Sequence, residues 1–124
     1  KKIIVLSSGE KVPPGDAEQA LLQDPVFEQV MVLGEGRAKL GLLCVSRLED
    51  LTELCARANA QLKDFPGYAK ISHITRAAEP WTVENGLLTP TLKLKRKEML
   101  ARFAREIDAM YATTDNCCPK KKTS

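Results

Sequence analysis

The sequence predicts an α+β domain: a small sheet, made of a β-hairpin plus about three strands, flanked by helices. Three observations lead to it. Short apolar and β-branched runs are separated by glycine-bearing turns, two longer segments repeat apolar residues at helical intervals, and 124 residues suit one hydrophobic core. A composition of 44% hydrophobic and 28% charged residues is close to the globular average. We therefore expect one domain over residues 1–112 and a flexible tail over residues 113–124.

The strands are predicted from their apolar patterns, over residues 2–6, 10–12, 28–33, 39–45 and 70–75. The turn Ser7-Ser8-Gly9 connects the first two strands as a hairpin. Residues 28–33 and 39–45 are apolar on both faces, which is typical of central strands that are covered on both sides. Because Gly34-Glu35-Gly36 joins them closely, we expect an antiparallel pair.

Three helices are predicted, over residues 16–23, about 47–62 and 95–111. Asp16 is expected to be the N-cap of the first, and Ser46 with Glu49 fits a capping box before the second. Apolar stripes give the buried faces of the other two helices: Leu51, Leu54, Ala58 and Leu62, then Leu100, Phe103, Ile107 and Met110. Residues 79–92 have no clean period and several helix breakers, so we expect a loop of functional length.

Charge and cysteine content exclude several functional classes. A net charge of +3 is too small to indicate nucleic-acid binding without a patterned basic patch. The apolar runs are short, so neither a membrane-spanning helix nor a signal peptide is predicted. Four cysteines without a C-x-x-C spacing and a single histidine give no zinc site, and they indicate a reducing, cytoplasmic compartment. The first residue is not methionine, so we expect a piece of a longer protein.

Two loop segments, residues 7–14 and 81–96, contain the candidate functional residues. Each has a purely structural interpretation. Gly9 can serve only as the turn residue of the hairpin, and Lys93 can belong to a solvated run of charges. His73 is more typical of a surface or hydrogen-bonded histidine than of a general base. Composition and periodicity alone lead no further than a folded α+β domain.

The order of the motifs adds a family resemblance. Residues 3–18, IIVLSSGEKVPPGDAE, resemble the segment that follows the interdomain hinge in the C-terminal domain of adenylate-forming enzymes. FPGYAK at residues 65–70 and EPWTVENGLLTPTLKLKR at residues 79–96 resemble the closing motif of the same domain. The resemblance extends from Lys1 to about Met110 and is greatest to the long-chain fatty-acid–CoA ligases. It implies the mobile C-terminal lid domain of an AMP-forming acyl-CoA synthetase.

The resemblance also implies a set of functional residues. They are Lys93 as the adenylation lysine, Ser8 and Gly9 beside the CoA channel, and Lys2 at or near the hinge. The position of Lys93 comes from aligning Thr89-Pro90 with the turn that precedes the lysine of the family. Thr91-Leu92 stands where many relatives carry Ser-Gly. A lysine at the tip of a lid would stabilise charge on phosphoryl oxygens only when the lid is closed.

The implied substrates are ATP, CoA and a fatty acid, and the implied partner is the N-terminal adenylation domain of the same chain. Mg²⁺ is expected in that domain, so we expect this chain to bind no metal or cofactor and to be inactive alone. Nucleic acid is not expected as a partner, and long-chain acyl substrates are compatible with peripheral membrane association. The alternative interpretation is a small basic α+β module that binds RNA or anionic lipid.

Overall fold

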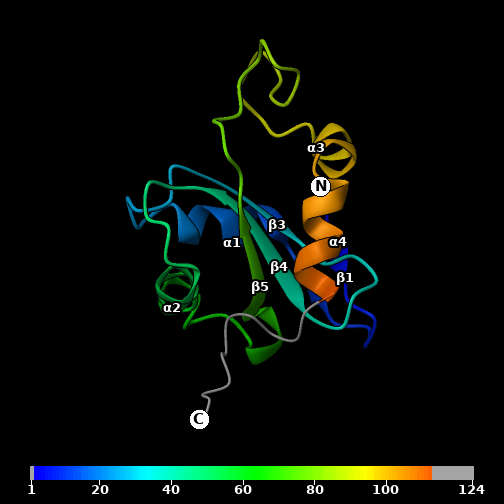
Figure 1. Cartoon of the computed structure of the whole chain (residues 1–124). Helices are drawn as coiled ribbons and strands as arrows, with labels where there is room; N and C mark the ends of the chain where they lie inside the picture. The colour runs from blue at the N-terminus through cyan, green and yellow to red at the C-terminus, as the bar shows by residue number, and fades with distance from the viewer. Residues whose placement is uncertain (1, 113–124) are drawn as a thin grey trace.

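The computed structural model describes residues 2–112, and the predicted tail over residues 113–124 lies outside them. The elements are β1 (Ile4–Val5), β2 (Lys11–Val12), α1 (Pro14–Leu21), β3 (Gln29–Leu33), β4 (Leu40–Val45), α2 (Leu51–Gln61), a 3₁₀ turn (Gly67–Ala69), β5 (Ile71–Arg76), α3 (Arg96–Arg102) and α4 (Ala104–Ala112). Helices lie on both sides of a small twisted sheet (Figure 1). The α+β class predicted from the sequence is confirmed.

The strands form two sheets instead of the single one that we expected. Strands β3 and β4 are antiparallel, with Val30 opposite Cys44, which confirms the predicted pair, and β5 runs parallel to β4 at its other edge. Strands β1 and β2 form a separate two-stranded sheet. The small sheet is tied to the turn after β3, where the N–H of Gly36 donates to the carbonyl of Val5 over 2.9 Å.

Both faces of the larger sheet are buried, as the apolar pattern of β3 predicts. Val30 and Val32 belong to one hydrophobic core, which α1 and α2 complete. Met31 and Leu33 point to the opposite face and belong to a second core, which includes Met99 of α3 and residues of α4. Figure 1 shows α1 and α2 on one side of the sheet and α3 and α4 on the other. The second core therefore holds the C-terminal helices and their preceding loop against the sheet.

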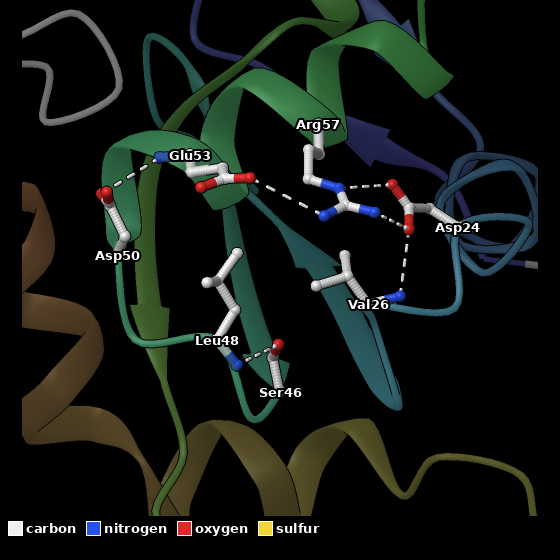
Figure 2. A network of polar contacts seen from close by, with 7 residues as sticks. All are labelled: Asp24, Val26, Ser46, Leu48, Asp50, Glu53 and Arg57. Atoms are coloured by element: carbon white, nitrogen blue, oxygen red, sulfur yellow. Dashed lines mark hydrogen bonds and ion pairs between the residues drawn. The ribbon is translucent and has the colours of Figure 1, made fainter.

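Both predicted N-caps are wrong. Helix α1 begins at Pro14, which needs no N–H partner at that position, and Asp16 lies in its first turn instead of capping it. Helix α2 is capped by Asp50, whose carboxylate accepts the N–H groups of the second and third helical residues at 3.0 and 3.2 Å. Ser46 is used in the turn after β4, where its Oγ accepts the N–H of Leu48 over 3.1 Å (Figure 2). The predicted capping box therefore does not form, because the Ser46 hydroxyl is used in this turn.

The predicted C-terminal helix is divided into two. The backbone leaves the helical conformation at Phe103, between α3 and α4. The break changes the phase of the apolar stripe, so Met99 is fully buried while Leu100, which we expected in the core, is 47% exposed. Ile107 and Met110 are buried as predicted.

An ion pair ties the connection between α1 and β3 to α2. Arg57 donates two hydrogen bonds to Asp24, at 2.8 and 2.9 Å, and lies 3.7 Å from Glu53 (Figure 2). Asp24 also accepts the N–H of Val26 over 3.0 Å. The hydrogen bonds from Arg57, and next that from Val26, hold the pKa of Asp24 below its usual value.

Candidate functional site

The segment before α3 is an ordered hairpin, although the sequence predicted an irregular loop. Leu88 pairs with Leu94 in an antiparallel bridge, and Lys95 N–H donates to the carbonyl of Leu87 over 2.9 Å. Leu87 and Leu88 are buried in the second core, with exposed fractions of 2% and 8%. The arms of this hairpin are therefore fixed to the domain, and residues 89–93 form its tip.

Hydrogen bonds within the tip define its shape. Thr89 N–H donates to the carbonyl of Lys93 over 2.8 Å, and Lys93 N–H donates to Oγ1 of Thr89 over 3.0 Å. Leu92 has a φ of 66°, in the left-handed region. That conformation costs a leucine about 1–2 kcal/mol, and a glycine would avoid the cost. The turn therefore keeps its shape at an energetic cost.

Lys93 lies at the end of this turn with its side chain exposed. It makes no ion pair with any residue in the range 2–112. Lys95 and Lys97 are also exposed, but Lys95 lies at the base of the hairpin and Lys97 is already inside α3. Of the three lysines, Lys93 is therefore the one at the tip of the hairpin, with its side chain exposed.

The base of the hairpin is anchored to β3. The side chain of Gln29 bonds both backbone groups of Trp81: its Oε1 accepts the N–H over 2.7 Å and its Nε2 donates to the carbonyl over 2.9 Å. Trp81 itself is 2% exposed and packs near Phe103, with ring centroids 6.4 Å apart. Thr82 and Asn85 then close a turn through two side-chain hydrogen bonds of 3.0 Å. The tip therefore stands on a rigid base.

A buried ion pair fixes the start of α3. Arg96 donates to both carboxylate oxygens of Glu18, at 2.6 and 2.9 Å, and the side chains are 25% and 9% exposed. Glu18 also accepts the N–H of Val32 over 2.8 Å. The pair joins α1, β3 and the chain three residues beyond Lys93. Charged pairs with such bidentate geometry are the strong ones.

Ser8 and Gly9 form the exposed turn between β1 and β2. Gly9 has a φ of 96°, and a Cβ placed on it would meet no atom within 4 Å. The Ser8 hydroxyl bonds the carboxylate of Glu10. A bond to a residue outside the hairpin also holds the turn: the N–H of Ser7 donates to the carbonyl of Arg37 over 2.9 Å. Gly9 therefore supplies the left-handed backbone conformation of the turn, and the space outside the turn is open.

The structure does not bring the two predicted sites together. In Figure 1 the yellow-green hairpin before α3 rises beyond one end of the sheet. The dark blue turn that connects β1 and β2 lies at the opposite end of the molecule. Lys93 and the Ser8-Gly9 turn therefore cannot contact one small bound group at the same time.

Two further predicted residues have clear surroundings. Lys2 is exposed and, with the exposed Ile3 and Leu100, lines a surface cavity of about 370 Å³. His73 is buried, its Nδ1 lies 3.0 Å from the carbonyl of Met110, and its ring lies 4.6 Å from that of Tyr111. His73 is therefore a packing residue, as the structural interpretation predicts. Within residues 2–112, no group of three or more potential metal ligands is clustered.

Comparison with known families identifies the domain. Residues 1–115 match the family described as the AMP-binding enzyme C-terminal domain. The chain belongs to this family. The resemblance inferred from the two motifs is thereby confirmed, and these matches do not support the alternative of an independent basic binding module.

The relatives of this AMP-binding C-terminal domain include long-chain fatty-acid ligases. A long-chain-fatty-acid–[acyl-carrier-protein] ligase of Arabidopsis thaliana is 30% identical over 90% of the chain, and human long-chain-fatty-acid–CoA ligase 1 is 30% identical over 91%. The chain covers only 17% and 20% of these proteins. The adenylation domain of a carboxylic acid reductase from Segniliparus rugosus, solved with AMP and a carboxylic acid, superposes with a TM-score of 0.78 at 25% identity, over 89% of this chain and 20% of that one.

The sequence analysis did not identify two residues that join distant parts of this AMP-binding C-terminal domain. Glu18 and Arg96 are the last residues of the two motifs that carry the resemblance, yet neither was predicted to have a role. A charged residue at the end of each motif was the available signal, but nothing in the sequence pairs positions 78 residues apart.

None of the helices within residues 2–112 is long and apolar enough to cross a membrane.

Proposed function

We propose that this chain is the lid domain of an ATP-dependent, AMP-forming long-chain fatty-acid–CoA ligase, and that Lys93 is its adenylation lysine. The observation that carries the proposal is the placement of Lys93. It is exposed at the tip of a hairpin whose base is anchored in the core, in a chain whose relatives are fatty-acid ligases. A rigid support for an exposed charge is what preorganised catalysis needs.

The first reaction gives Lys93 a specific task. A carboxylate oxygen of the fatty acid forms a bond to the α-phosphorus of ATP, the bond from that phosphorus to pyrophosphate breaks, and pyrophosphate leaves. Negative charge concentrates on the phosphoryl oxygens and on the incoming carboxylate. An ammonium group that meets these oxygens lowers the barrier, by about 10²–10³ in rate for one such donor. Closure of the lid also excludes water from the adenylate.

The second reaction uses the other end of the domain. The sulfur of CoA forms a bond to the acyl carbon, the bond from that carbon to AMP breaks, and the thiol proton is released. Because the Ser8-Gly9 turn lies at the end opposite the Lys93 hairpin, a rotation of the domain exchanges one for the other (Figure 1). Gly9 lets the backbone approach the thiol arm closely. Lys2, exposed at the start of the described chain, is at or near the pivot.

The proposal requires an N-terminal adenylation domain as the partner in the same protein. That domain would hold ATP, Mg²⁺ and the acyl chain, and the isolated chain would release no AMP from ATP, fatty acid and CoA. The cytoplasmic location and the peripheral contact with a membrane remain predictions of the same proposal.

Substitution of the lysine tests the proposal in the full-length enzyme. Lys93→Ala should lower fatty-acid-dependent ATP–pyrophosphate exchange by about 10²–10³. Lys97→Ala, which removes an exposed lysine from α3, is the matched control and should leave exchange within about twofold of the unsubstituted enzyme. Exchange that survives Lys93→Ala would contradict the assignment, and Lys95 would become the residue to test.

A further inference from the structure

One residue, Thr89, holds the tip of the hairpin that carries Lys93. Thr89 uses all three of its polar groups on the residues that follow it. Its N–H donates to the carbonyl of Lys93 over 2.8 Å, and its carbonyl accepts the N–H of Leu92 over 2.7 Å. Its Oγ1 accepts the N–H of Lys93 over 3.0 Å and lies 3.1 Å from Oγ1 of Thr91. Both backbone polar groups of Lys93 therefore bond to the same residue.

Packing does not provide an alternative support for the tip. Pro90, Thr91, Leu92 and Lys93 are all exposed, and Leu92, the largest apolar side chain among them, is 68% exposed. The left-handed conformation of Leu92 is unfavourable for a leucine, so the turn persists only because other bonds hold it. Two of those bonds are backbone bonds of Thr89 and one is made by its hydroxyl. Loss of the hydroxyl would keep the backbone bonds but remove the partner that Lys93 N–H has in the described part of the chain, so the peptide of Lys93 would be held less firmly.

We propose that Thr89 is a positioning residue for Lys93: its hydroxyl fixes the peptide of Lys93 and thereby directs the ammonium group. This inference rests on the proposed function of Lys93. The hydroxyl itself touches no substrate in this account and acts only through the lysine. A displacement of about 1 Å in a reacting group can cost about 100-fold in rate, so a loosened turn affects adenylation strongly.

The matched variants are Thr89→Val and Thr89→Ser in the full-length enzyme. Valine keeps the shape of the side chain and removes the hydroxyl, whereas serine keeps the hydroxyl. Thr89→Val should lower kcat for fatty-acid-dependent pyrophosphate exchange by about 10–100-fold, with KM for ATP changed far less. Transfer of a preformed acyl-adenylate to CoA should be unchanged, and so should the melting temperature. Thr89→Ser should restore exchange to near the unsubstituted rate.

Lys93→Ala, measured beside these variants, separates the two claims. In its background Thr89→Val should cause no further loss, because the hydroxyl acts through the lysine. If Lys93→Ala lowers exchange by about 10²–10³ while Thr89→Val leaves it unchanged, the positioning role is wrong and the lysine assignment stands. If Thr89→Val lowers both half-reactions together with the melting temperature, the hydroxyl is a structural group and the positioning role is again wrong. If Lys93→Ala leaves exchange intact, both claims fall.

Discussion

Replacement of Glu18 by alanine should destabilise the domain more than any exposed charge substitution. The carboxylate accepts two hydrogen bonds from Arg96 and one from the N–H of Val32, and its side chain is only 9% exposed. Glu18→Ala leaves the buried N–H of Val32 and the guanidinium of Arg96 without this partner. It also cuts the link between α1 and the start of α3.

The magnitude follows from burial. Removal of one partner from a buried ion pair costs about 3–5 kcal/mol. Arg96 is one-quarter exposed and can turn partly into water, so we expect the lower end, about 3 kcal/mol. For a domain of this size that corresponds to a fall of about 12 °C in Tm. Arg96→Ala should cost at least as much, because the charge that it strands is the more buried one.

Urea unfolding followed by tryptophan fluorescence measures these changes directly. Trp81 is the only tryptophan and is 2% exposed, so its emission reports the loss of the second core. Glu49→Ala is the control, since Glu49 is exposed, and it should change the free energy of unfolding by no more than about 0.5 kcal/mol. The double variant Glu18→Ala/Arg96→Ala should cost less than the sum of the single variants.

The reasoning would be refuted by either of two results. One is a loss in Glu18→Ala of less than about 1 kcal/mol, comparable to that of an exposed residue. The other is strict additivity in the double variant, which would mean that Glu18 and Arg96 do not interact in solution.

Two further predictions concern ionisable groups. The pKa of Asp24 is lowered by its hydrogen bonds from Arg57 and Val26, so its contribution to stability is complete above the unfolded value near 3.8 and is lost as the pH falls below about 4. Urea unfolding between pH 3 and 6 should therefore show a smaller acid loss in Asp24→Asn than in the unsubstituted chain, and equal losses would contradict the ion pair. Burial raises the pKa of Cys44 to about 12, so an aromatic disulfide reagent at pH 8 should label it only after unfolding, as peptide mass mapping would show. Rapid labelling of Cys44 in the native state would be inconsistent with this burial.

The sequence predicted the strands well because their signal is local. The alternation of Val30 and Met31 between two apolar faces, and the glycines that follow β3, determine a covered antiparallel pair without knowledge of the rest of the chain. The helix starts were predicted less well. Ser46 and Asp50 are both good caps, and the choice between them depends on where β4 ends and how the chain turns.

Features that depend on distant residues were not predictable in this way. The division of the last helix at Phe103 reverses the expected burial of Leu100, since an unbroken period was assumed. The Glu18–Arg96 pair and the anchoring of Trp81 by Gln29 each join residues more than fifty positions apart. The motif resemblance indicated which loops matter, but the hairpin that supports Lys93 became visible only in the structure.

The central claim is that one domain presents two ends to one active site in turn. The most direct measurement compares Lys93→Ala with Gly9→Leu in the full-length enzyme, with both half-reactions assayed for each. The account predicts that Lys93→Ala lowers pyrophosphate exchange by about 10²–10³ and spares transfer of a preformed adenylate to CoA. Gly9→Leu, which places a side chain in the open space outside the turn and strains the left-handed backbone there by about 1–2 kcal/mol, should do the reverse while the domain stays folded. If each variant impairs both half-reactions equally, the two ends do not act separately and the account is wrong.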